Sequence, residues 1–385
     1  MRTARIILCA ALLAVAAAYW SGDGRAAFSP RQKAGIARLV RSTMLGSYHP
    51  GMVVGIWAPG RGTYVRAFGT ANAGRGRRLR VTDRFKIGSI TKTFTASIVL
   101  QLAQEGKLSL DDPLSKWKPS IRSAAGITVR QLLNHTSGLP NYAPSLDRQV
   151  RRNPFRRLTH AQIIDPALRQ PYTPNGIFNY SNINYFLLGE IAQMVTKKPL
   201  ATLLRRRIFR RFRLRHTAFV PGSVLPSPFA HGYQFPGGHR IDVTRWPTWY
   251  GWAAGSIVST LGDLKRWARI VATGRGLLSP AMQQQRLTFV PTGATGIGYG
   301  LGIFQYGAFL GHDGAVYGYD STMLYSPTLR STFVLLGTSE PDNGAPVWSQ
   351  GVTTLALFPE LVAAVYPNLE KPSHVHHVAR GVRTR

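Results

Sequence analysis

Ser89 and Lys92 are the first pair of residues whose types and spacing suggest nucleophilic chemistry. They stand in the run Ser89-Ile90-Thr91-Lys92, where a strand-like segment at 84–88 meets an amphipathic helix expected over 91–105. Residues three positions apart share a helix face, so the lysine amine is placed to take or relay the proton of the serine. The helix N-terminus adds positive potential and free N–H groups. We therefore predict that Ser89 is a nucleophile activated by Lys92.

A second Ser-x-x-Lys match, Ser115 to Lys118, shows that this pattern alone is not specific. It lies between Pro113 and Pro119, where we expect no helix that would orient the two side chains. We therefore assign no chemistry to Ser115.

Tyr180-Ser181-Asn182 is the second element of the predicted site. A tyrosine beside a lysine can have a lowered pKa, because the cation favours phenolate. Tyr180 would then act as a base toward the serine and later as an acid toward the leaving group. The amide of Asn182 can both donate and accept hydrogen bonds. The competing interpretation is a loop that caps a helix expected over 183–196.

His312-Asp313-Gly314 is the third element, and it lies in a glycine-rich, strand-like region. A glycine in a strand allows a ligand backbone to approach, and the following N–H, that of Ala315, can point at an oxyanion. The competing interpretation is a histidine in a glycine-rich turn.

The elements that must position these residues follow from the hydrophobic pattern. The segments 52–58 and 62–68, separated by Pro59-Gly60-Arg61, predict a β-hairpin. Helix and loop follow to about residue 240, then a helix near 260–272 and strands at 299–306, 308–312, 321–325 and 332–337. Strands at both ends predict one α/β part (28–88 and 241–366) around an inserted, mainly helical part (89–240).

Composition excludes several classes of protein. The 385 residues are 44% hydrophobic, which is not a disordered composition, and the 39 glycines show no collagen-like triplet period. The single cysteine, Cys9, makes no internal disulfide. After residue 20 no apolar run approaches the ~18 residues needed to span a bilayer.

The N-terminus predicts a secretory signal peptide over residues 1–27. Arg2 and Arg5 precede an apolar stretch at 6–20, which is followed by small and polar residues. Cleavage after Ala18 or Ala26 fits the pattern, and a retained membrane anchor is the alternative. We expect a periplasmic or extracellular protein, which contains no cysteine once the segment is removed.

The charge is strongly basic: 48 Lys and Arg against 16 Asp and Glu give a formal net charge of +32. Such a charge attracts polyanions, but the predicted export and the lack of nucleic-acid-binding motifs argue against nucleic acid. Seven arginines lie within the eleven residues Arg205–Arg215. This run is either a helix end whose apolar residues face the core or a docking patch for an anionic envelope polymer or lipid surface. The tail at 367–385 is expected to be disordered, and we predict no metal site at its histidines.

The three motifs, taken in order, resemble those of the penicillin-recognising serine hydrolases. The closest branch contains class C β-lactamases, DD-carboxypeptidases and β-lactamase-fold esterases. Four further segments also match this family: 83–89, 132–139, 178–182 and 255–260. The resemblance extends from about residue 36 to 340. It implies an α/β (α+β) fold, in which an antiparallel sheet is flanked by helices and joined to an inserted, mainly helical domain.

The resemblance also implies a role for each motif residue. Ser89 would be acylated, Lys92 and Tyr180 would transfer protons, and Asn182 would bind the acyl-side amide. The N–H groups of Ser89 and Ala315 would form the oxyanion hole. No metal and no organic cofactor is implied.

The third motif departs from the family pattern. His312, which precedes Asp313 and Gly314, takes the place of a lysine in β-lactamases, and this weakens a β-lactamase assignment because its charge is titratable. Asp313 replaces a hydroxyl residue. A carboxylate facing the cleft would repel a substrate carboxylate, whereas a side chain that points away would not.

We therefore predict an exported serine hydrolase that forms a covalent acyl-enzyme on Ser89. A D-alanyl-D-alanine carboxypeptidase or related peptidoglycan D-peptide hydrolase, acting on a stem peptide, is the first hypothesis. A carboxylesterase of the same fold is the alternative, and a non-catalytic wall-binding module is the second alternative.

Overall fold

The computed structural model describes residues 27–74, 76–340 and 352–369. The predicted signal peptide, apart from Ala27, and the tail beyond residue 369 lie outside the described residues, as do Cys9 and the three histidines of the tail. No helix within the described ranges is long and apolar enough to cross a membrane.

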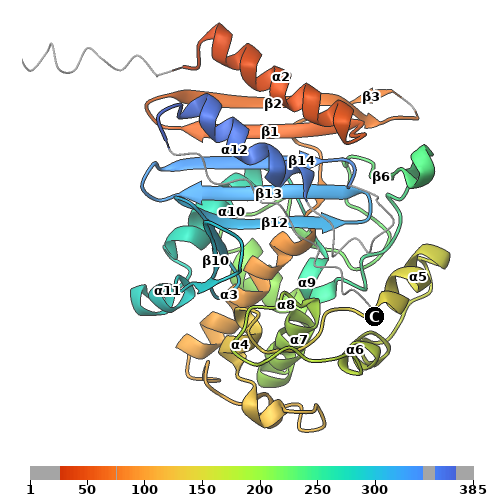
Figure 1. The fold of residues 1–385 in the computed structure, drawn as a ribbon, viewed down its shortest axis with the longest axis vertical. Coiled ribbons are helices and arrows are strands. Elements are labelled where there is room, and N and C mark those ends of the chain that lie inside the picture. Colours follow the sequence, from red (N-terminus) through yellow and green to blue (C-terminus); the bar gives the residue numbers. More distant parts are fainter. Residues whose placement is uncertain (1–26, 75, 341–351, 370–385) are drawn as a thin grey trace, which may run out of the picture.

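Within the described residues, nine strands form one sheet in which every pairing is antiparallel (Figure 1). Strands from the two ends of the chain meet at its centre, where β1 pairs with β14. In sheet order the strands are β3 (Arg77–Arg78), β2 (Gly62–Asn72), β1 (Gly51–Ala58), β14 (Ser331–Gly337), β13 (Tyr319–Ser326), β12 (Phe309–Val316), β11 (Phe304–Tyr306), β10 (Ile297–Tyr299) and β9 (Val290–Pro291).

Helices cover both faces of this sheet, as the alternation of side chains along its central strands requires. Val54 of β1 packs into the core beneath α2 (Pro30–Gly46) and α12 (Thr353–Val365). Its neighbour Val53 points to the opposite face and joins the core that contains α10 (Leu261–Thr273). The central strands are therefore buried on both sides. Helices α2 and α12 were not predicted from the sequence.

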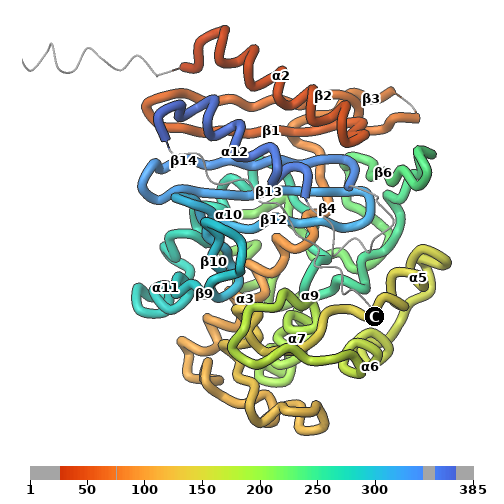
Figure 2. The backbone as a smooth tube through the Cα atoms, in the orientation of Figure 1, coloured from red at the N-terminus to blue at the C-terminus, as the bar shows by residue number. Residues whose placement is uncertain are grey.

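The remaining helices form a second mass beside the sheet (Figure 2). Helix α3 is its centre, with Thr91 to Leu102 buried throughout. The bounds are α3 (Thr91–Gln104), α4 (Val129–Leu133), α5 (Pro144–Arg152), α6 (His160–Leu168), α7 (Asn182–Thr196), α8 (Leu200–Leu204), α9 (Trp252–Gly255) and α11 (Pro280–Arg286), with the short helices η1 (Gly88–Ile90), η2 (Leu114–Lys116), η3 (Ala124–Gly126), η4 (Arg205–Phe209) and η5 (Pro236–Gly238). The small sheets are β4 (Phe85–Lys86), β8 (Ile257–Ser259) and β5 (Ala218–Phe219), and β6 (Tyr233–Gln234) with β7 (Ile241–Asp242).

The structure confirms the predicted fold class and the hairpin at 52–68. The prediction of a single strand over 299–306 is wrong, because the chain turns at 300–303 and forms the antiparallel pair β10–β11. At this turn Gly300 N–H donates to the carbonyl of Ile303 at 2.8 Å, and Gly302 has a φ of +74°. A Cβ at Gly302 would also clash with Ala96, so glycine is required here.

The arginine run has the helix-end structure that was one of its two predicted interpretations. Helix α8 continues into η4, and Ile208, Phe209 and Leu214 are buried while Phe212 is half-buried. The arginine side chains are left on the surface.

Candidate active site

Ser89 lies in η1, between β4 and the buried helix α3. Two glycines allow η1 to approach β12 closely. A Cβ at Gly88 would lie 2.8 Å from the Ala315 nitrogen, and one at Gly314 would lie 2.8 Å from the Ser89 nitrogen. Side chains at these positions would force the two backbones apart. The glycines thus place the N–H groups of Ser89 and Ala315 on adjacent segments.

Lys92 is fully buried one helical turn after Ser89. Its Nζ lies 2.8 Å from Ser89 Oγ, and it donates to Asn182 Oδ1 at 2.7 Å and to the carbonyl of Ala254 at 3.1 Å. Burial lowers the pKa of Lys92 well below its ordinary value, and the nearby Asp313 carboxylate opposes this shift. A neutral amine that donates to Asn182 and Ala254 keeps its lone pair for the hydroxyl of Ser89.

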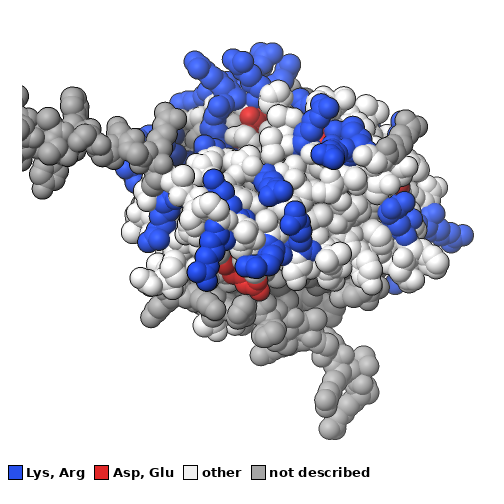
Figure 3. Space-filling model, turned by 90° about the horizontal axis from the view of Figure 1, so that it is seen from above, with Lys and Arg blue, Asp and Glu red and all other residues white. Residues whose placement is uncertain are grey.

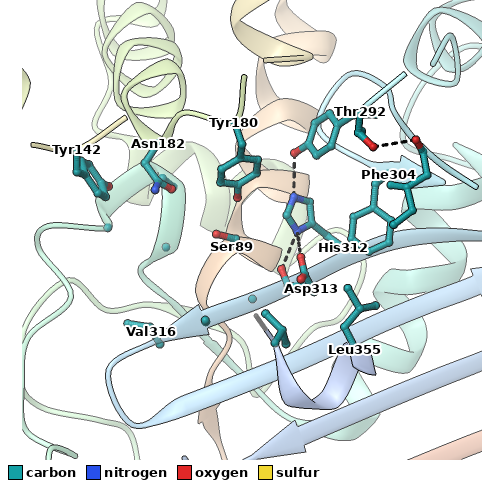
Figure 4. A pocket seen from close by; sticks show the side chains of 18 of the residues that line it. Ser89, Tyr142, Tyr180, Asn182, Thr292, Phe304, His312, Asp313, Val316 and Leu355 are labelled. Carbon is teal, nitrogen blue, oxygen red and sulfur yellow. Dashed lines mark hydrogen bonds and ion pairs between the residues drawn. The ribbon is translucent and has the colours of Figure 1, made fainter. Parts of the chain in front are cut away.

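Tyr180 precedes α7, and its hydroxyl points toward Ser89 (Figure 4). Lys92 Nζ lies 4.9 Å from the centre of the tyrosine ring. Burial raises the pKa of Tyr180 well above its ordinary value, and a hydrogen bond to Ser89 opposes this only in part. The predicted lowering of the pKa is therefore wrong, because removal of the phenol from water outweighs its neighbours. Tyr180 is a protonated phenol at neutral pH.

Asn182 is the first residue of α7, and it connects Lys92 to a residue that the sequence analysis missed. Both its backbone nitrogen and its Nδ2 donate to Asn141 Oδ1, at 3.0 and 3.1 Å. Ser181 occupies the N-cap position, but its hydroxyl donates to the carbonyl of Pro140 instead of capping α7. No spacing signal links Asn141 to Asn182, because 41 residues separate them.

The third motif lies within β12, which runs to Val316 and is longer than predicted. His312 is buried, with Nε2 2.8 Å from the hydroxyl of Tyr299 and Nδ1 2.6 Å from the Asp313 carbonyl. The Asp313 carboxylate lies 3.4 Å from His312 Nδ1, and its side chain is 20% exposed. Asp313 lines the pocket beside His312, so the alternative in which it points away from the cleft is wrong (Figure 4).

These residues surround a cavity of about 350 Å³. Ser89, Tyr180, Asn182 and the third motif occupy part of its wall. Most of the rest is aromatic or aliphatic, including Tyr142, Phe178, Tyr250, Ile297, Phe304 and Leu355. Among the described residues that line the cavity there is no lysine and no arginine, and Asp313 is the one carboxylate. The described cavity wall thus carries no lysine or arginine although the whole chain has a net charge of +32.

His135 is a further residue of the site to which the sequence analysis assigned no role. It is completely buried, and its ring centre lies 4.3 Å from that of Tyr180. Its Nδ1 accepts from the backbone N–H of Ser181 at 3.2 Å and pairs with Asn184 Nδ2 at 3.1 Å. Burial lowers the pKa of His135 well below its ordinary value. A neutral ring thus supports the tyrosine and fixes the backbone beside it.

The prediction that no helix lies between Pro113 and Pro119 is wrong, because the short helix η2 contains Ser115. This helix nevertheless does not bring Ser115 and Lys118 together. Lys118 Nζ contacts Glu190 Oε2 at 2.6 Å and is not recorded in contact with Ser115. Nor do the described residues contain a cluster of three His, Cys, Asp or Glu side chains placed to hold a metal ion.

Comparison with known proteins agrees with this geometry. Residues 36–350 match the family model described as Beta-lactamase, which covers most of the chain. The chain belongs to the beta-lactamase family. The motifs identified from sequence all lie within the matched segment.

This beta-lactamase-family chain is similar to relatives that carry different names. It is 30% identical over 228 residues to Protein flp of Staphylococcus aureus (strain NCTC 8325 / PS 47), covering 57% of this chain and 45% of flp. It is 25% identical over 302 residues to Penicillin-binding protein 4* of Bacillus subtilis (strain 168), covering 72% and 66%. The chain therefore spans about half the length of the first of these relatives.

A solved structure is similar over almost its full length. The D-stereospecific amidohydrolase from Streptomyces sp. superimposes with a TM-score of 0.73 at 28% identity, covering 86% of this chain and 98% of that one. The fold and the hydrolase family are thus shared with an enzyme named for amide hydrolysis.

Proposed function

We propose that this beta-lactamase-family hydrolase cleaves amide bonds through a covalent acyl-enzyme on Ser89. The observation that carries the proposal is the 2.8 Å contact between Ser89 Oγ and the buried Lys92 amine. Burial lowers the pKa of Lys92 and so favours the neutral amine that a general base must present. The contact opens onto a cavity large enough for a small peptide or amide.

The reaction follows from the positions of five groups. Lys92 takes the hydroxyl proton of Ser89 as Oγ attacks the substrate carbonyl, and the negative charge on the carbonyl oxygen is stabilised by the N–H groups of Ser89 and Ala315. Tyr180, a protonated phenol, donates its proton to the leaving nitrogen as the C–N bond breaks, and recovers one from Lys92. Asn182 orients Lys92 and binds the substrate amide. Water then attacks the ester carbonyl and gives its proton to the same pair of residues, which return a proton to Ser89 Oγ as its bond to the acyl carbon breaks and the acid is released.

Within amide hydrolysis, the charge of the pocket favours substrates without a carboxylate beside β12. Asp313 contributes a negative charge, and no lysine or arginine lines the described wall to offset it. A free ammonium group, as in a D-amino acid amide or a peptide N-terminus, would be attracted. The relationship to a D-stereospecific amidohydrolase supports this class.

D-alanyl-D-alanine carboxypeptidase activity is the second candidate. It is supported by the similarity to a penicillin-binding protein and by His312, whose Nδ1 lies 3.4 Å from the Asp313 carboxylate. The imidazole of His312 beside this carboxylate would lessen its repulsion of a substrate carboxylate. Ester hydrolysis by the same acyl-enzyme is the third candidate.

Three substrates and one probe test these proposals together. The protein would be incubated with D-alanine amide, a peptide ending in D-Ala-D-Ala and a short-chain aryl ester, and labelled with a fluorophosphonate. We expect turnover of the amide and one phosphonyl adduct in the 85–105 region, both lost in Ser89→Ala and retained in Ser115→Ala. Adducts that persist in Ser89→Ala would refute the assignment. If the wild-type protein hydrolyses none of the three substrates and is not labelled by the fluorophosphonate, the chain would be the non-catalytic module.

We also propose that the chain is exported through its N-terminal segment. Arg2, Arg5 and the apolar stretch at 6–20 support this. The test is the intact mass of the protein secreted by a producing cell, with loss of 18 or 26 residues expected. A protein that keeps Met1 and stays with the membrane would indicate the retained anchor.

A further inference from the structure

A second concave surface lies on the helical part of the chain, where α8 and η4 meet β5. It has a volume of about 720 Å³ and shares no lining residue with the catalytic cavity. Four arginines surround it, and we name it the arginine groove: Arg205, Arg210, Arg213 and Arg215. Its floor includes the apolar side chains of Phe209, Leu214 and Phe219.

The local fold explains why the guanidinium groups gather there. Phe209 packs edge-on against Phe94 of the central helix α3, with ring centres 5.8 Å apart. Leu214 is also buried, and Arg213, with a φ of 54°, turns the chain back after the helix. Burial of the apolar residues therefore directs the intervening arginines toward solvent, around one hollow.

The charge of the arginine groove is not balanced within the described residues. Arg207, which lies outside the groove, forms an ion pair with Glu105. Among the described residues, the side chains of the four groove arginines form no hydrogen bond or ion pair, and no Asp or Glu lines the groove. Asp263 contacts one lining residue, Thr217, but this carboxylate is buried and also accepts from the backbone of His216. The buried Asp263 carboxylate therefore does not neutralise the four surface arginines of the groove.

We propose that the arginine groove binds a phosphodiester chain. Guanidinium groups bind phosphate oxygens in bidentate geometry, and four of them around one hollow match several successive phosphates. The apolar floor fits the carbon segments between the phosphates. A flat bilayer would not reach the floor of a concave surface, so the shape favours a polymer over a membrane. Binding there would hold the enzyme on an anionic polymer without occupying the catalytic cavity.

The test measures binding of fluorescent poly(glycerol phosphate) to the full chain by anisotropy. Counterion release by four phosphate contacts predicts that affinity falls about 50-fold between 50 and 200 mM salt. The groove variant carries Arg205→Gln, Arg210→Gln, Arg213→Gln and Arg215→Gln, and its affinity should fall at least tenfold.

A matched control removes the same charge elsewhere. Lys and Arg side chains are spread over the face seen from above, which carries α2 (Figure 3). Arg31, Lys33, Arg38 and Arg41 of α2 are exposed and are replaced by Gln in the control variant. This control should keep most of the affinity. Both variants should keep wild-type melting temperatures and wild-type labelling of Ser89.

Each outcome decides the proposal. Equal losses in the two variants would show that net charge alone attracts the polymer, and would overturn it. Binding to phosphatidylglycerol vesicles without binding to the polymer would also overturn it. Single-stranded DNA presents the same phosphodiester chemistry, so DNA binding that is tighter than polymer binding and lost in the groove variant would support the site and identify a different source.

Discussion

Replacing Asp313 by Asn removes the one carboxylate of the described cavity wall while keeping the size and planarity of the side chain. If this charge selects substrates, the variant should change the ratio of activities toward differently charged substrates. The D-Ala-D-Ala peptide, with its free carboxylate, should gain relative to a neutral aryl ester. D-alanine amide, with its free ammonium group, should lose.

The magnitude follows from the distance and the exposure of Asp313. A substrate charge about 5 Å away interacts by about 3 kcal/mol at an effective dielectric of 20 and by about 1 kcal/mol in water. The side chain is 20% exposed and so lies between these limits. We expect the kcat/KM of the peptide, relative to that of the ester, to rise between about fivefold and 100-fold.

The neutral ester is the essential control, because Asp313 also acts on the catalytic base. Its charge raises the pKa of Lys92 against the effect of burial, so the variant will alter proton transfer with every substrate. The ratio of two substrates cancels this shared effect. An equal change on all three substrates, or a selective loss on the peptide, would refute charge selection, and the carboxypeptidase hypothesis would gain. Asp313→Thr, which introduces a hydroxyl, should give the same direction of change.

Three further predictions concern the base, its support and the core. Lys92→Ala and Tyr180→Phe should each slow acylation about 10²- to 10⁴-fold, measured with the fluorophosphonate or a slow ester, and wild-type rates in either variant would remove that residue from proton transfer. His135→Phe keeps a ring against Tyr180 but removes the Nδ1 that accepts from the Ser181 N–H, so kcat should fall about 10- to 100-fold at nearly constant KM. His135→Asn, whose Oδ1 can replace Nδ1, should recover most of this loss. Equal losses of kcat in the two variants would contradict a positioning role. Burial raises the pKa of Asp320 from 3.8 to about 8 and lowers that of His49 from 6.5 to about 3. The folded state therefore holds an extra proton on Asp320 between pH 3.8 and 8 and one fewer on His49 between pH 3 and 6.5. Between pH 6.5 and 8 the Asp320 contribution to the free energy of unfolding falls by about 2 kcal/mol, while burial lowers the pKa of Lys86 to about 7 and so acts in the opposite direction. Urea titrations should therefore show the free energy of unfolding of Asp320→Asn rising by about 2 kcal/mol relative to that of the wild type across this range, and a constant difference would contradict the shift.

Local spacing was sufficient to predict the parts of the site that lie within one turn of helix or one hairpin. Ser89 and Lys92 are three residues apart, and helical geometry places such residues on one face, within reach of the 2.8 Å contact that the structure shows. The β1–β2 hairpin follows in the same way from a short turn between two apolar segments. These predictions needed no knowledge of the rest of the chain.

Contacts across long stretches of sequence could not be predicted in this way. His135 meets Ser181 across 46 residues, and Tyr299 reaches His312 only because β10 and β11 fold back on each other. The predicted direction of the Tyr180 pKa shift was wrong for a related reason. A neighbouring lysine is visible in a motif, but the removal of water by several packed elements is not.

The glycines of the first and third motifs connect these two scales. The sequence singled out Gly314 as part of its motif, but it did not show that Gly88 and Gly314 each lie against the backbone of the other segment. The Gly88 Cα faces Ala315, and the Gly314 Cα faces Ser89, so the nucleophile and the predicted oxyanion donors come together only if neither position has a side chain. The same approach brings Asp313 to the wall that also contains Ser89. Positioning of the reacting groups and selection of substrate charge therefore depend on one backbone contact between η1 and β12, and a residue that alters this contact should change both together.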